Sequence, residues 1–382
     1  MTSPPNPSRR SAIRTVAGMS LVAATPIWAQ STKSVSTSRS PTVAQVVDMS
    51  TGQIDVSKDF LVGSRAAWQE INGRGGLQGS PVKHLVLEVN GSLADIRTAV
   101  EALKAEPLCV AIFGTAGDLA ASQLAGILGR ELPDVPHVAP WLQNVEAVAS
   151  PNTFTVFASR QDQIAHAIKS LSSVGMTEVG AIYGSAAEYA AYRSDLEQIG
   201  KALKLSVKSY APASDLREVA LLLTPDSPRV LLFVGGTPEL VRFAQGVDKQ
   251  AAQRYIIAMS DVNLQSIQQM GVVSRFTPII ATQVVPLVNS SLPIVRAYRA
   301  ALGRLYDEPP TPLSLAGYMS ARFTYEVLQG MDGPVNRQNA LQAFARRNPV
   351  DLGGFRIVPD GRNRGTAFVT QSMITVDGRL LG

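Results

Sequence analysis

The stretch CVAIFGTAGDLAASQL, residues 109–124, places a strand-like segment directly before a helical one. Residues 108–113 form an apolar run, which is typical of a strand that is buried on both faces of a sheet. Gly114 and the small residues after it predict a turn, and residues 117–130 have the apolar spacing of a helix. A strand that leads through a short turn into a helix predicts one βα unit of a parallel sheet.

Strand-like and helical segments alternate in this way along most of the chain. Two successive sets of five apolar runs, separated by helical patterns, predict an α/β protein with two doubly wound parallel-sheet lobes. In such lobes the carboxyl ends of the strands face a crevice, where ligands bind. The predicted strands are residues 43–47, 82–89, 108–113, 135–139 and 153–157 in the first set, and 179–183, 205–210, 230–234, 255–259 and 278–283 in the second.

The alternation ends after Pro286, where the pattern changes to helices and an extended tail. The helices are predicted at about residues 292–305, 313–330 and 337–346, and we expect this part of the chain to cross back between the lobes. The predicted organisation is an export signal at residues 1–29, a flexible linker at 30–41, lobe 1 at 42–158 and 284–335, and lobe 2 at 159–283 and 336–382.

The first 29 residues have the features of a cleaved export signal. Arg9, Arg10 and Arg14 precede an apolar run that is too short to span a membrane comfortably, and Ala29 offers a small residue at the cleavage point. The arginine pair is similar to that of a twin-arginine leader, and the ordinary Sec route remains the alternative. Export of this kind predicts a periplasmic protein.

The excess positive charge of the chain lies in this leader and in the linker after it. The whole chain has 35 Lys and Arg residues against 30 Asp and Glu residues. Residues 1–41 contain five of the basic residues and no acidic one, which leaves 30 of each sign for the remainder. A balanced remainder gives no reason to expect a nucleic-acid partner. Cys109 is the only cysteine, so a disulfide within the chain is impossible.

The sequence lacks the motifs of common cofactor and catalytic sites. The glycine-rich stretch at residues 73–79 ends a helix and precedes a strand, so it predicts a tight turn rather than a dinucleotide site. His84, His137 and His166 have no neighbouring acid or cysteine at a catalytic or metal-binding spacing. We therefore expect neither an enzyme nor a bound cofactor or metal.

Six loops that follow predicted strands carry the polar residues of a binding cleft. They offer small hydroxyl groups, backbone N–H groups near helix N-termini, aromatic side chains and a few acids, which suits a small polar solute. These loops are residues 48–53, 114–118, 140–144, 184–189, 235–239 and 260–263.

Several motifs occur together in a definite order from about residue 43 to the end of the chain. The most specific is INGRGGLQG at residues 71–79, and it is followed by VAIFGTAGDLAASQLAGIL, VPHVAPW, NTFTVFASRQDQ, VGAIYGSAAEYAAYRSDL, VLLFVGGTPELVRFAQ and the terminal VDGR. In these motifs the chain resembles the type I periplasmic solute-binding proteins of ABC transporters, in the branched-chain amino-acid and amide branch.

The resemblance implies a function as well as a fold. It implies two lobes that are joined by a three-stranded hinge and close on a small polar solute, such as an amino acid, an amide or a related carboxylate. A monomeric receptor of this kind would deliver its solute to ABC permease subunits at the inner membrane. The alternative is a ligand-sensing module that reports to a membrane receptor without transport.

The resemblance also implies roles for particular residues of the cleft loops. Thr115 and its turn match a loop that binds the carboxylate of amino-acid ligands, and Asp261 matches an acid that pairs with the ligand ammonium. Tyr189 matches an aromatic residue of the second lobe. Trp141 stands where a small residue is common in the family. The candidate ligand-binding residues are Ser50, Thr51, Gly114, Thr115, Ala116, Gly117, Trp141, Tyr189, Gly236 and Asp261.

Four of these side chains also have a possible structural role. Thr115 and Asp261 can each cap the helix that follows them. Tyr189 and Trp141 can pack in a core without touching a solute. The sequence leaves both roles open for each of the four residues.

Overall fold

The computed structural model describes residues 40–144, 150–250, 252–271, 277–358, 368–375 and 380–382. The predicted export signal and most of the predicted linker lie outside the described residues. The chain from Arg39 to Gly382 forms one compact unit, which contains two large sheets. No helix within the described ranges is both long and apolar enough to cross a membrane.

The first sheet consists of five parallel strands in the order β2-β1-β3-β4-β5. Each of them coincides with one of the five apolar runs of the first predicted set, β1 being one residue longer at each end, and β1 lies between β2 and β3 as in a doubly wound fold. The strands are β1 (Thr42–Asp48), β2 (Lys83–Val89), β3 (Cys109–Phe113), β4 (His137–Val138) and β5 (Thr153–Phe154).

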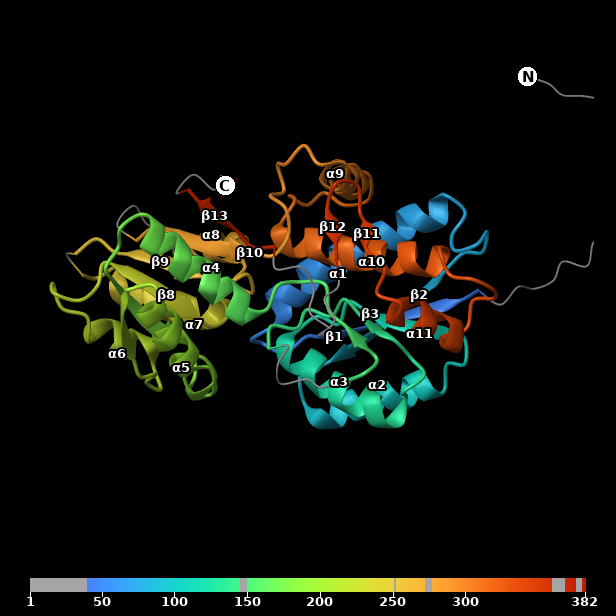
Figure 1. Cartoon of the computed structure of the whole chain (residues 1–382), viewed down its shortest axis with the longest axis horizontal. Helices are drawn as coiled ribbons and strands as arrows, with labels where there is room; N and C mark the ends of the chain where they lie inside the picture. Colours follow the sequence, from blue (N-terminus) through green and yellow to red (C-terminus); the bar gives the residue numbers. More distant parts are fainter. Residues whose placement is uncertain (1–39, 145–149, 251, 272–276, 359–367, 376–379) are drawn as a thin grey trace, which may run out of the picture. The chain divides into compact units, whose positions relative to one another are not determined.

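Helices cover both faces of the first sheet, because successive residues of a strand point to opposite sides. Val43 of β1 belongs to the core that contains α1 and α10, whereas Ala44 belongs to the core that contains α2 and α3. Figure 1 shows these helices gathered about the first sheet. Their bounds are α1 (Ile54–Gly73), α2 (Leu93–Lys104), α3 (Asp118–Glu131) and α10 (Pro312–Gln329).

The second sheet has seven strands in the order β14-β13-β10-β9-β8-β6-β7. The five strands of the second predicted set are parallel, and β13 from the tail of the chain pairs antiparallel with β10. The strands are β6 (Glu178–Tyr183), β7 (Ser206–Tyr210), β8 (Val230–Val234), β9 (Tyr255–Ala258), β10 (Ile279–Gln283), β13 (Thr370–Ile374) and β14 (Leu380–Leu381).

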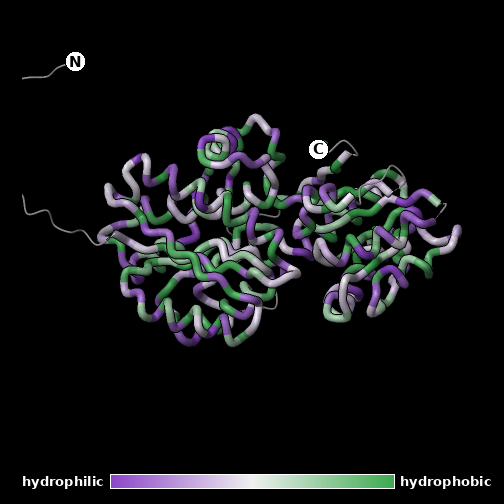
Figure 2. The backbone as a smooth tube through the Cα atoms, turned by 180° about the vertical axis from the view of Figure 1, so that it is seen from behind, coloured by the Kyte–Doolittle hydropathy of each residue, from purple (hydrophilic) through white to green (hydrophobic). Residues whose placement is uncertain are grey.

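Two groups of helices cover the two faces of the second sheet. One core contains α4 and α5, and the other contains α6, α7 and α8. In Figure 2 the residues of the strands are mostly hydrophobic, and the helices around them contain more hydrophilic residues. We call each sheet with its covering helices a lobe. The helices are α4 (Arg160–Ser173), α5 (Ala186–Ala202), α6 (Leu216–Leu221), α7 (Thr237–Val247) and α8 (Leu264–Gln269).

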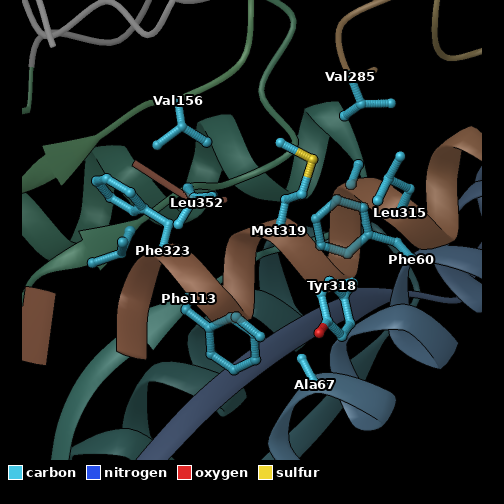
Figure 3. Packing of buried hydrophobic residues seen from close by; sticks show 14 of the residues in the cluster. Phe60, Ala67, Phe113, Val156, Val285, Leu315, Tyr318, Met319, Phe323 and Leu352 are labelled. Carbon is cyan, nitrogen blue, oxygen red and sulfur yellow. The ribbon is translucent and has the colours of Figure 1, made fainter. Parts of the chain in front are cut away.

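The helices α1 and α10 pack with their backbones almost in contact. A Cβ atom added at Gly63 would lie well inside the van der Waals distance of the Ser314 carbonyl oxygen, and one at Gly317 would meet the Phe60 carbonyl oxygen. Figure 3 shows the ring of Phe60 beside Leu315 and Met319 of α10. The absence of a side chain at these two glycines therefore permits the tightest helix contact of the first lobe.

The segment after α10 differs from its predicted assignment. The sequence predicts that residues 336–382 belong to lobe 2, but of the described residues in this range only those of β13 and β14 pair there. The helix α11 (Arg337–Ala345) instead packs on β3, where the Arg337 guanidinium donates to the carbonyl oxygens of Cys109 (2.9 Å) and Glu106 (3.0 Å). Phe344 is buried in the first-lobe core. A contact between segments so far apart in the chain cannot be predicted from the local sequence pattern.

The remaining elements of the C-terminal part also pack on the first lobe. The helix α9 (Pro293–Leu305) and the strand pair β11 (Val350–Asp351) and β12 (Arg356–Ile357) contribute buried residues to the core of α1 and α10. The chain thus passes between the lobes after β5, after β10 and before β13. Much of the third crossing lies outside the described residues.

Candidate ligand-binding site

Three candidate loops of the first lobe are tied together at the carboxyl ends of its strands. The backbone N–H of Asp48 donates to the carbonyl oxygen of Ala116 (2.9 Å), and that of Trp141 donates to the carbonyl oxygen of Thr115 (2.8 Å). The Asp118 carboxylate accepts from the backbone N–H of Gln143 (2.6 Å). The loops after β1, β3 and β4 therefore form one continuous edge of the first sheet.

A buried arginine joins this edge to the second lobe. Arg160 is the first residue of α4, whose start is fixed by a capping box between Ser159 and Asp162. Its backbone N–H donates to the Gln143 carbonyl oxygen (2.9 Å). Its guanidinium donates from Nη2 to Asp261 Oδ2 (2.5 Å) and is therefore in direct contact with the loop after β9.

Further side chains complete this group, which we call the Arg160 cluster: Gln143, Arg160, Gln163, Glu188, Tyr192 and Asp261. The Arg160 guanidinium lies 3.4 Å from Glu188 Oε1, and its carbon lies 5.3 Å from the centre of the Tyr192 ring. The Gln163 amide donates to Gln143 Oε1 (2.8 Å) and accepts from the Ser260 backbone N–H (2.8 Å). The cluster therefore connects loops of both sheets.

The charges in the Arg160 cluster are strongly coupled. Arg160 is 4% exposed and Asp261 is 7% exposed. Burial raises the pKa of Asp261 despite the nearby guanidinium, and burial also raises the pKa of Glu188 to about 7. Burial lowers the pKa of Arg160, but the nearby carboxylates of Asp261 and Asp118 raise it more. The pKa of Arg160 therefore lies above its usual value. One cation thus faces two carboxyl groups, Asp261 and Glu188, whose burial disfavours the charged form.

Five polar atoms in and beside the cluster are buried and have no hydrogen-bond partner among the described residues. They are Trp141 Nε1, Gln143 Nε2, Arg160 Nε, Ser260 Oγ and Asp261 Oδ1. Buried polar groups are nearly always paired in folded proteins, and an unpaired one costs about 1–3 kcal/mol. The five atoms in and beside this one cluster are therefore available to a polar ligand.

Two predicted residues of the first lobe are engaged within it. Thr115 is fully buried, and its hydroxyl lies 2.8 Å from His137 Nε2. Burial lowers the pKa of His137 to about 3, so this imidazole is neutral near pH 7. Trp141 packs edge-on against Phe60 (5.8 Å between ring centres) and Phe157 (5.2 Å). Trp141 thus has a core role, while its indole N–H stays unpaired.

The small residues of the predicted site shape the first-lobe turns. Gly114 and Gly117 have φ of 52° and 106°, values that favour glycine, and Gly117 is the N-cap of α3. Ala116 is buried and bridges to β1. Ser50 donates its backbone N–H to Asp48 Oδ1 (2.9 Å), and Thr51 is exposed.

The second-lobe candidates lie in different surroundings. Gly236 is the N-cap of α7, and a Cβ atom added there would lie 4.0 Å from the carbonyl oxygen of Gly52 in the loop after β1. Tyr189 packs against Tyr183 (5.1 Å between ring centres), and its hydroxyl accepts from Arg193 (2.9 Å). The aromatic residue that meets the cluster is Tyr192, one helical turn further along α5.

Sequence reasoning missed Gln143, Arg160, Gln163, Glu188 and Tyr192. The capping pattern SRQD does place Arg160 at the start of a helix. Nothing in that pattern says that the arginine is buried, since arginine is mostly exposed in folded proteins. Within the described part of the chain, no group of three or more His, Cys, Asp or Glu residues is placed to hold a metal ion.

A second polar contact joins α1 to the other lobe. Asp59 Oδ2 accepts from the Asn263 amide (3.2 Å) at the N-cap of α8 and from the Thr311 hydroxyl (2.8 Å) at the N-cap of α10. The pKa of Asp59 is raised to about 6, mainly by burial; the nearby Glu308 and Asp55 also raise it, and the two hydrogen bonds lower it. The folded protein therefore binds a proton at Asp59 more tightly than the unfolded chain does.

Asp59→Asn should remove part of the pH dependence of stability. The contribution of Asp59 is fully present below its unfolded pKa near 4 and is lost as the pH rises through about 6. Between pH 4.5 and pH 8 the wild-type protein should therefore lose about 2 kcal/mol more stability than the variant. Urea unfolding at both pH values measures this difference, and the exposed Asp226→Asn is the matched control. A difference equal to that of the control would contradict the assignment.

Comparison with known protein families shows which family the chain belongs to. A family model described as periplasmic binding protein matches residues 40–377. The chain belongs to the periplasmic binding protein family. The predicted recognition and the predicted fold class are thereby confirmed. No curated protein sequence gives a significant match to the chain.

Solved structures of the periplasmic binding protein type share the fold at low sequence identity. An extracellular ligand-binding receptor from Verminephrobacter eiseniae is 18% identical, with a TM-score of 0.81 over 90% of this chain and 100% of that one. A leucine-binding protein from Thermotoga maritima is 14% identical (TM-score 0.76, covering 89% and 97%). An ABC transporter substrate-binding protein from Desulfitobacterium hafniense, in complex with Leu, is 16% identical (TM-score 0.72, covering 89% and 98%).

Proposed function

We propose that this periplasmic binding protein is exported to the periplasm and captures a small polar solute between its lobes for an ABC importer. The observation that carries the proposal is the Arg160 cluster with its unpaired polar atoms. A solute that pairs with atoms of both lobes would favour the state in which the lobes are closed. An ABC permease would then distinguish the closed protein from the open one.

The chemistry of the cluster favours a solute that carries both hydrogen-bond donors and acceptors. Asp261 Oδ1 is an unpaired acceptor, whereas Trp141 Nε1, Gln143 Nε2 and Arg160 Nε are unpaired donors. Amino acids and primary amides present both kinds of group within a few bonds. A purely anionic solute would meet the carboxyl groups of Asp261 and Glu188 and is disfavoured by charge.

A binding screen tests the proposal. The purified protein would be heated with saturating L-leucine, L-glutamine, acetamide, urea, 4-hydroxybenzoate or succinate, and each hit would be measured by calorimetry. A solute that binds only the folded state raises its stability by mass action. We expect a hit among the amino acids or amides. If none of a broad panel of small polar solutes binds, solute capture is contradicted.

Asp261→Asn gives the site-specific prediction. The variant keeps the size of the side chain and loses its charge, so it should weaken binding of a cationic or zwitterionic solute about 10-fold or more, which is about 1.4 kcal/mol. Binding of the matched anion without the ammonium group, such as 4-methylpentanoate in place of leucine, should change much less. Calorimetry on both proteins measures the two ratios, with Asp226→Asn as the control. Equal losses for both solutes would remove Asp261 from the site.

The transport step can be separated from a sensing role. Deletion of the gene should abolish uptake of the solute found in the screen, because an importer needs its binding protein. Unchanged uptake with loss of a cellular response to that solute would instead support the ligand-sensing alternative.

A further inference from the structure

A second cavity lies where α8 and the ends of β9 and β10 meet the segment that leads into α10. Its volume is about 250 Å³, and Ser260, Leu264, Gln265 and Gln268 of the second lobe line it together with Pro310 and Leu313 of the first. We propose that this cavity binds a small uncharged solute with one hydrogen-bonding head group and a short apolar body. The cavity, named here the α8 cavity, is chemically unlike the Arg160 cluster.

The absence of charge in the lining decides the class of ligand. Among the residues described for the α8 cavity, every polar one is Ser, Thr, Asn or Gln, and the others are apolar. A buried charge without an opposite partner is very costly, so the cavity disfavours ions and zwitterions. The Arg160 cluster, in contrast, consists largely of charged side chains. The α8 cavity therefore disfavours charged solutes, whereas the Arg160 cluster can pair with them.

Polar groups without partners mark one side of the cavity. Gln265 and Gln268 are half-buried, three residues apart on α8, and their side-chain amides make no hydrogen bond within the described residues. Ser260 is 2% exposed, and its hydroxyl has no hydrogen-bond partner in the described part of the chain. Carboxamides and hydroxyls offer donors and acceptors without charge, which complements a primary amide or an alcohol.

Apolar residues form the opposite part of the lining and limit the size of the solute. Leu264 and Leu313 are 5% and 3% exposed, and Val262 and Ile374 also line the cavity. Pockets for drug-sized ligands usually measure roughly 300–1,000 Å³, so this cavity fits a smaller molecule. A chain of about five or six carbons with a polar head satisfies both the volume and the lining.

An occupant of the α8 cavity would touch both lobes. Leu264 belongs to the second-lobe core and Leu313 to the first-lobe core, so the solute would bias the equilibrium between open and closed lobes. Ser260 also precedes Asp261 in the loop after β9. If the proposed solute capture at the Arg160 cluster holds, binding at the two places is linked, and each solute changes the affinity of the other by the same factor.

Hexanamide is a suitable probe, and hexanoate at pH 8 is its charged counterpart. Calorimetry should detect hexanamide binding to the purified protein, with hexanoate at least about 10-fold weaker. The double change Gln265→Ala and Gln268→Ala should weaken hexanamide at least about 10-fold. These amides make no internal hydrogen bond, so the variant should keep its fold, and Gln268→Leu alone gives a second, milder test.

The glutamine variants separate the α8 cavity from the Arg160 cluster, because Gln265 and Gln268 line the cavity and do not belong to the cluster. The exposed Asp226→Asn, which belongs to neither place, is the control and should bind hexanamide with wild-type affinity. No hexanamide binding up to its solubility limit would overturn the proposal. Full retention of hexanamide binding in both glutamine variants would overturn it as well. Failure of the amino-acid and amide screen at the cluster would leave this result unaffected, so the two proposals fail independently.

Discussion

Arg160→Met is expected to lower the free energy of unfolding by about 3–5 kcal/mol. The change removes the only cation among the described residues that contacts Asp261 and leaves this buried carboxyl beside Glu188 without compensation. Removing one partner of a buried ion pair costs this much because the other charge stays out of water. Methionine keeps most of the volume, so lost packing contributes little. Urea unfolding at pH 7 measures the effect.

The pH dependence and a surface control make this prediction specific. Acid should reduce the loss, because protonation of Asp261 and Glu188 removes the uncompensated charge. Arg193→Met is the matched control: Arg193 is 49% exposed and pairs with Glu197 at 2.8 Å, so its loss should cost less than about 1 kcal/mol. A loss in Arg160→Met that equals the control at pH 7 would contradict the buried cluster.

Gly317→Ala is expected to cost about 3 kcal/mol or more, or to prevent folding. The added methyl group would overlap the carbonyl oxygen of Phe60, and the backbones of α1 and α10 would have to separate. Thermal unfolding followed by circular dichroism measures the effect.

Gly126→Ala is the matched control for this prediction. Gly126 is exposed in α3, and a Cβ atom there would have no neighbour within 4 Å. Alanine is the better helix former, so this control should be neutral or more stable by up to about 1 kcal/mol. Gly317→Ala with wild-type stability would show that α1 and α10 do not pack as described.

The alternation of strands and helices could be predicted from the sequence because it is a local property. Apolar runs such as Val230–Val234 are buried on both faces and form central strands, as expected. Placement of α11 was not predictable, since it depends on contacts with distant elements: α11 packs on β3 and α10, and the Phe344 ring meets those of Phe154 and Phe323. The antiparallel pairing of β13 likewise depends on a partner almost ninety residues earlier.

The site could be predicted only at the level of loops. Chain order and the βα pattern place Thr115, Trp141 and Asp261 at strand ends, and the structure brings their loops to the sheet edges. The pattern cannot tell whether a side chain turns inward. Tyr189 and Tyr192 lie on the same helix three residues apart, and only the fold determines which of them meets Arg160.

A crystal structure with the tightest solute of the screen tests the central claim most directly. The account predicts the solute between the lobes, with a hydrogen bond to Asp261 Oδ1 and at least one of the unpaired donors of Trp141, Gln143 or Arg160. A solute bound to a single lobe, away from these atoms, would contradict it.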